Sequence, residues 1–148
     1  MCLGQAENRR IDCFYCKCLR RFLGVRPAYL SRISNHTVLQ MAQREPLSLI
    51  LRRQRMLYLG DVARRDATDA VRGVLFDSQS SEFKQLQAIR RRGRPRKTWI
   101  QNVLKDCLEA AGTKERLNEF FKQTTGELNM KQMSEWRRLV LKWTSDRR

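Results

Sequence analysis

Residues typical of catalysis are scarce in this chain of 148 residues, which contains one histidine, His36, and 15 acidic residues spread along its length. No two aspartates are adjacent, so the paired carboxylates that hold two metal ions in nucleotidyl-transfer sites are missing. Phosphate-binding P-loops, glycine-rich dinucleotide-binding loops, H-E-x-x-H zinc-protease motifs and G-x-S-x-G nucleophile elbows are missing too. We therefore expect no enzymatic activity from this chain by itself, no catalytic residue and no cofactor.

Long apolar runs are absent as well. No segment approaches the length of about 20 apolar residues that a membrane-spanning helix needs. Near the N-terminus, four charged residues interrupt the apolar region that a signal peptide requires: Glu7, Arg9, Arg10 and Asp12. The sequence thus predicts an intracellular protein with no membrane contact, whose five cysteines are reduced thiols.

Three of the cysteines are closely spaced, as Cys13-x-x-Cys16-x-Cys18, and invite the interpretation of a zinc site with His36 as fourth ligand. The second ligand pair of the common zinc-finger spacings is missing, however. The three cysteines also fall within a helical pattern, where cysteine packs as a small apolar residue. We therefore expect no bound metal.

Positive charge dominates the composition, because 31 lysines and arginines against 15 acidic residues give a net charge of +16. The excess is uneven: residues 1–97 contain 21 basic and 8 acidic residues, whereas residues 98–148 contain 10 and 7. Such an excess of one sign opposes compaction and favours a polyanionic partner. RNA or DNA is therefore the expected ligand.

The densest run of positive charge lies at residues 90–97. Gly93 and Pro95 prevent a regular helix through this run, so we expect an extended, solvated arm that ends where Thr98 caps the next helix. An extended row of cations suits a phosphate backbone. The candidate nucleic-acid-binding residues of this basic arm are Arg90, Arg91, Arg92, Arg94, Arg96 and Lys97.

Apolar residues recur with helical spacing through most of the chain, and we predict the clearest helices at residues 6–23, 47–65, 99–111 and 130–143. The pattern predicts a mostly α protein: a small helical domain of about five to six helices, with the extended basic arm at 90–97. We expect an N-terminal helical lobe at 1–66, an irregular linker and arm at 67–97, and a C-terminal helical lobe at 98–148. Capping residues are expected to end helices at Gly24 and Gly112 and to begin them at Ser34 or Asn35, at Thr113 and at Asn129.

Two of these helices carry more specific expectations. In the helix at 6–23, the apolar stripe predicts that Tyr15 and Phe22 pack in the core. The helix at 47–65 is apolar on two sides, which predicts burial between neighbouring elements. Arginines that flank its apolar sides or lie in its C-terminal turn could also face the phosphates of a nucleic acid. They are Arg52, Arg53, Arg55, Arg64 and Arg65.

Five stretches follow one another in a characteristic order. They are Cys18-Leu19-Arg20-Arg21-Phe22-Leu23-Gly24, then Arg32-Ile33-Ser34-Asn35 with Val38-Leu39, then residues 52–64, then Arg92-Gly93-Arg94-Pro95-Arg96-Lys97-Thr98-Trp99, and finally Trp136-Arg137. The series resembles the region C-terminal to the polymerase palm in reverse transcriptases of LINE-type, non-LTR retrotransposons, over residues 9–143. One departure is Gly60-Asp61-Val62, where that family commonly has Gly-His-Val.

The resemblance implies a C-terminal fragment that handles RNA or DNA beside the catalytic domain. The family's metal-binding aspartate pair lies upstream of the matched region, and neither that pair nor the family's endonuclease residues are matched in this chain. The resemblance thus implies a basic helical module without the polymerase active site, with the missing polymerase domain as a second expected partner.

Two other hypotheses stay open. Arg92-Gly93-Arg94-Pro95 is similar to the core of an AT-hook, which lies in a narrow A·T minor groove, although Arg91 replaces the usual preceding proline and there is one copy. The chain could instead be a non-functional relic of a retroelement, or a fragment that needs the missing polymerase to bury its apolar faces. The arm could also act as a nuclear localisation signal, which favours a nuclear location.

Overall fold

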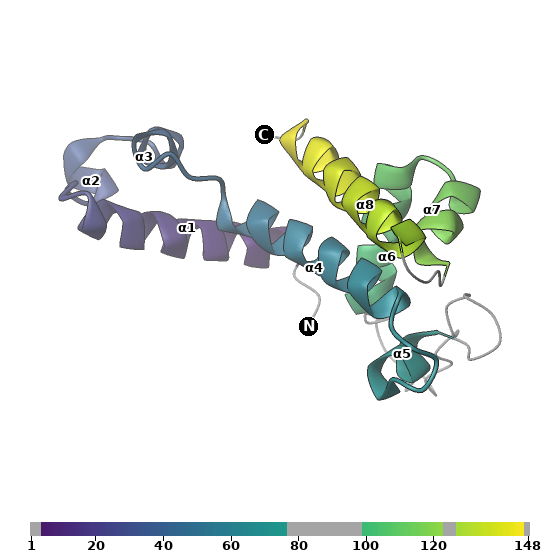
Figure 1. The fold of residues 1–148 in the computed structure, drawn as a ribbon. Helices are drawn as coiled ribbons and strands as arrows, with labels where there is room; N and C mark the ends of the chain where they lie inside the picture. The colour runs from purple at the N-terminus through teal and green to yellow at the C-terminus, as the bar shows by residue number, and fades with distance from the viewer. Residues whose placement is uncertain (1–3, 77–98, 123–126, 147–148) are drawn as a thin grey trace, which may run out of the picture. The chain divides into compact units, whose positions relative to one another are not determined.

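The computed structural model describes residues 4–76, 99–122 and 127–146, and helices account for most of them (Figure 1). In chain order the helices are α1 (Gln5–Phe22), α2 (Ala28–Ser31), α3 (Asn35–Met41), α4 (Leu47–Ala63), α5 (Ala70–Leu75), α6 (Trp99–Ala111), α7 (Lys114–Phe121) and α8 (Glu127–Ser145). The mostly α prediction is confirmed. The described part contains more helices than the expected five to six, and the two shortest are α2 and α5. The basic arm and Thr98 lie outside the described residues. None of the described helices is long and apolar enough to cross a bilayer.

Most of the predicted helix ends are confirmed. Gly24 and Gly112 follow α1 and α6 with φ of 68° and 83°, the left-handed backbone that glycine adopts without strain. The hydroxyl of Ser34 accepts from the Thr37 amide at 3.1 Å, and that of Thr113 accepts from the Arg116 amide at 3.3 Å. The prediction for Asn129 is wrong, because α8 begins earlier, at Glu127.

The chain divides within α4 into two compact units, which we call the first unit (1–52) and the second unit (53–147). The predicted lobes were 1–66 and 98–148, with a linker between them. The difference arises because Met56, Leu59 and Val62, on the C-terminal part of α4, share a core with α6, α7 and α8. Residues 53–66 therefore belong with the C-terminal helices.

The first unit has few fully buried apolar side chains among its described residues, namely Cys16 on α1 and Val38 on α3. Polar contacts supplement this small core. The carboxylate of Asp12 accepts from the Ser48 amide at 2.8 Å and from its hydroxyl at 2.6 Å, which fixes the first turn of α4 against α1. Such a contact satisfies a helix-terminal N–H that would otherwise lack a partner.

Arg20, which is 4% exposed, makes a second set of polar contacts in the first unit, after those between Asp12 and Ser48. One of its terminal nitrogens donates to the main-chain carbonyl of Ile33 and to Asn35 Oδ1, and the other donates to the Arg26 carbonyl and Ser31 Oγ. This guanidinium therefore holds residues 26–35 against α1, although Arg20 does not belong to the apolar stripe of the helix.

The exposed face of α1 also differs from the prediction. Phe22 is 89% exposed, so its predicted core position is wrong, and Phe14 on the same stripe is 67% exposed; Tyr15 is half-buried. The reason is geometric: α1 packs against α3 along the side of Cys16 and Arg20, and the apolar stripe is wider than that single contact.

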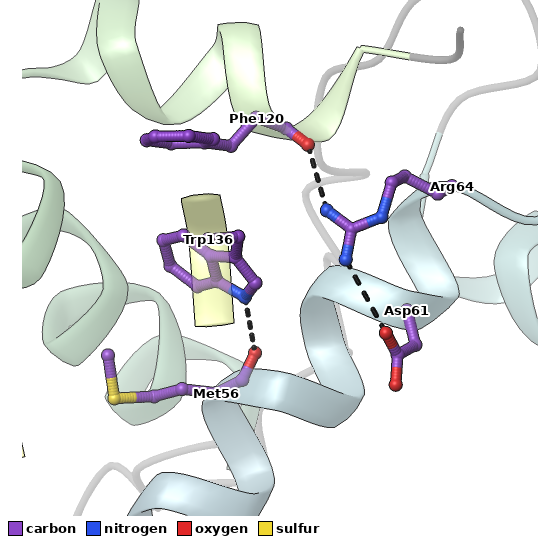
Figure 2. Close-up of polar contacts among 5 residues, drawn as sticks. All are labelled: Met56, Asp61, Arg64, Phe120 and Trp136. Carbon is purple, nitrogen blue, oxygen red and sulfur yellow. Dashed lines mark hydrogen bonds and ion pairs between the residues drawn. The ribbon is translucent and has the colours of Figure 1, made fainter. Parts of the chain in front are cut away.

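The core of the second unit is built around Trp136 of α8, which is fully buried. Its ring centroid lies 5.5 Å from the ring centroids of Phe120 and Phe121 on α7. Its indole Nε1 donates a hydrogen bond to the Met56 carbonyl of α4 at 3.4 Å (Figure 2). Gly60 lies one turn after Met56 and gives the indole its space. A Cβ at position 60 would lie 2.4 Å from Nε1 of Trp136. A contact this short requires the helix or the indole to move.

Candidate nucleic-acid interface

The five arginines of the predicted interface in and directly after α4 differ in how far their side chains are exposed to solvent. Arg52, Arg53 and Arg55 are half-buried, and Arg52 and Arg53 take part in interactions with other residues. A long side chain in this position can lay its stem along the protein and keep its charged end at the surface. These three residues remain candidates for phosphate contact.

The side chain of Arg64 is only 4% exposed. Its guanidinium donates to the Phe120 carbonyl of α7 at 3.1 Å and to Asp61 Oδ1 at 3.4 Å (Figure 2). Burial lowers the pKa of Arg64, and the neighbouring Asp61 carboxylate opposes that shift. This arginine connects α4 to the end of α7, so its predicted surface role does not fit its position.

Arg65, the next residue, is the accessible cation of this turn, with a side chain that is 42% exposed. It forms an ion pair with Asp69 at 3.3 Å. The Asp69 carboxylate also caps α5, accepting from the Val71 and Arg72 amides at 2.9 and 3.0 Å, and the bond from the Arg72 amide is the main cause of its lowered pKa. The side chain of Arg65 thus reaches solvent, but the charged carboxylate of Asp69 beside it partly neutralises its positive charge.

Sequence reasoning missed a more favourable surface on α1, which we call the basic face: Arg10, Phe14, Lys17 and Arg21. All four side chains are exposed. Their spacing of i, i+4, i+7 and i+11 places them on one side of a helix. A signal for this surface was present in the sequence, because residues 13–44 contain six lysines and arginines and no acidic residue.

A groove of about 590 Å³ between α6, α7 and α8 is the other basic feature of the second unit. Arg116, Arg138 and Lys142 line it, but so do Glu135 and Asp146. The guanidinium of Arg116 also lies 5.9 Å from the ring centroid of Phe120. Acidic side chains in the wall repel phosphate, so the groove is less suited to a polyanion than the basic face.

The cysteines do not converge in the described part of the chain. Cys16 is buried and its Sγ lies 3.9 Å from the Asn35 carbonyl, whereas Cys13, Cys18 and His36 are exposed. No group of three or more candidate ligands lies together among the residues that the structure describes. Burial is the main cause of the raised pKa of Cys16, and the Asp12 carboxylate adds to it, so this thiol stays protonated at neutral pH.

Comparisons with family models, with curated proteins and with solved structures find no match to this chain. The proposed function is therefore argued from the residues. Two stretches that carry the retrotransposon resemblance do meet in the fold, because Trp136 packs on Gly60. This contact explains, from packing alone, why a glycine at position 60 suits a tryptophan at position 136.

Proposed function

We propose that this chain is a nucleic-acid-binding C-terminal fragment of a retroelement reverse transcriptase, without the polymerase active site and without catalytic activity of its own. The observation that carries the nucleic-acid part is the basic face, where Arg10, Lys17 and Arg21 are accessible on one side of α1. Residues 13–44, which include Lys17 and Arg21, contain no acid. The retroelement part rests on the ordered series of sequence stretches. The proposed partners are RNA or DNA and the missing polymerase domain, and the proposed location is the nucleus.

Binding in this proposal is electrostatic and has little sequence preference. The cations of the basic arm follow successive phosphates, and the accessible cations of α1 and α4 add further contacts. Each neutralised phosphate releases condensed counterions, which is the source of the free energy. Contacts to phosphate position the chain on a nucleic acid but do not read its bases.

The test is the affinity of the full chain for single-stranded and double-stranded 20-mers across a salt series. If about five phosphates are engaged, log K should fall against log salt with a slope of roughly −3.5 to −4.5, depending on the strand form. Fluorescence anisotropy with end-labelled RNA and DNA of several sequences measures both quantities. Binding that stays undetectable at low salt would refute the proposal.

A minor-groove hook is the second candidate, favoured by Arg92-Gly93-Arg94-Pro95. An AT-hook reads the width and edge pattern of A·T minor grooves. In that case Arg94→Ala would weaken binding to A·T-rich duplex far more than binding to G·C-rich duplex or RNA. Phosphate contact predicts equal losses on all of them.

A further inference from the structure

Resting on the proposed nucleic-acid binding, we propose that the basic face of α1 is a site for single-stranded nucleic acid, with an unpaired base stacked on Phe14 and phosphates on Arg10, Lys17 and Arg21. The site uses other residues than the basic arm and the α4 arginines. It lies wholly within the first unit, so its geometry depends on one helix.

The geometry of α1 supports this site. Arg10 and Arg21 are 11 residues apart, which is about 16 Å along a helix axis, and Phe14 and Lys17 lie between them. The opposite side of α1 is held by Cys16 and by the hydrogen bonds of Arg20. The cations and the aromatic ring are therefore presented by a fixed helix.

The exposure of Phe14 is the reason for proposing a single-stranded ligand. A phenylalanine that is 67% exposed leaves a ring face open to solvent, and the residues one turn before and after it are cationic. Stacking of bases on aromatic rings beside phosphate-binding cations is the usual mode of single-strand recognition. Bases in a duplex are already stacked and paired, so they cannot offer a face to the ring.

The same pattern continues beyond the basic face. Phe22 at the end of α1 is 89% exposed and Tyr29 on α2 is 81% exposed, with exposed Arg21 and Arg26 beside them in the sequence. Each exposed aromatic residue described in the first unit thus has an exposed cation within four residues. A surface built only to dock an apolar protein segment does not require that alternation.

The test compares Phe14→Leu with Phe14→Trp in the full chain, using anisotropy with a labelled 20-nucleotide single strand and a duplex of equal length at 50 mM salt. Leucine keeps the apolar character and removes the aromatic ring, whereas tryptophan keeps a stacking surface. We expect Phe14→Leu to weaken single-strand binding by roughly fivefold or more. Duplex binding should be unchanged, and Phe14→Trp should retain the affinity of the unmodified chain. Circular dichroism checks that both variants keep their helices.

The outcomes separate this inference from the function on which it rests. If the unmodified chain binds neither substrate, both are overturned. If it binds but Phe14→Leu leaves the preference for single strands unchanged, the inference alone is overturned.

Discussion

Replacing Arg20 with methionine is expected to lower the free energy of unfolding of the first unit by about 2–3 kcal/mol. Methionine matches the length of the buried stem but cannot donate to the Ile33 and Arg26 carbonyls, Ser31 Oγ or Asn35 Oδ1. Two main-chain carbonyls would then lose a charged donor in a unit whose apolar core is small. Arg20→Lys keeps the charge but replaces the planar guanidinium with a single ammonium group. We therefore expect an intermediate loss of unfolding free energy.

The tryptophans allow this prediction to be measured for one unit at a time. Trp99, Trp136 and Trp143 all lie in the second unit, so tryptophan fluorescence reports the unfolding of that unit, whereas far-ultraviolet circular dichroism reports both. In urea titrations, Arg20→Met should move part of the dichroism transition to lower urea and leave the fluorescence midpoint in place. Unchanged transitions by both probes would show that the Arg20 contacts contribute nothing to stability.

Gly60→Ala is expected to destabilise the second unit by about 1–3 kcal/mol, which is opposite in sign to the usual effect of this substitution. Within an exposed helix, glycine to alanine stabilises by about 1 kcal/mol. At position 60 the new methyl group would lie 2.4 Å from Nε1 and 2.7 Å from Cδ1 of Trp136. Overpacking of this kind outweighs the gain in helix propensity, and it displaces the indole from the Met56 carbonyl.

Two comparisons make this prediction specific. Gly73→Ala on α5 is the matched control, because no atom lies within 4 Å of a Cβ there, and it should be neutral or stabilising. Trp136→Phe removes the crowded Nε1, so the cost of Gly60→Ala should be smaller in that background. Fluorescence from Trp99 and Trp143 still follows unfolding in those variants. A stabilising effect of Gly60→Ala in the unmodified chain would contradict the packing described for Trp136.

Local patterns were enough to predict the long helices and most of their ends. The apolar spacing at 99–111 and the caps at Gly24, Ser34 and Thr113 act within a few residues, so the sequence alone contains the information. Asn129 is not the cap because α8 already begins at Glu127. The extent of burial depends on which neighbours pack, and a single sequence does not contain that information.

The buried arginines are the clearest example of what local patterns miss. Arg20, Arg64 and Arg72 are charged, yet each donates to a main-chain carbonyl outside its own helical turn, of Ile33, Phe120 and Ala63 respectively. A guanidinium offers five donors, so it can be buried wherever the chain brings carbonyl groups together. Charge alone thus predicted a phosphate contact for Arg64, whose guanidinium instead donates to the Phe120 carbonyl and to Asp61.

The basic face was missed for the opposite reason. Phe22 was predicted to pack in the core because it repeats with the other apolar residues of α1, and Phe14 lies on the same stripe. The described part of the first unit provides too little packing surface to cover the whole stripe, and both rings stay exposed. The acid-free composition of residues 13–44 was the available signal for an exposed basic surface.

The central claim is that this chain binds nucleic acid through rows of accessible cations, and a paired salt titration tests it most directly. The full chain and its Arg94→Ala, Arg96→Ala double variant are titrated with the same single-stranded and duplex 20-mers from 50 to 200 mM salt. We predict that the slope of log K against log salt becomes shallower by about two in the variant, with equal weakening for all sequences. An identical slope in the two proteins, or no binding by either at the lowest salt, would contradict the account.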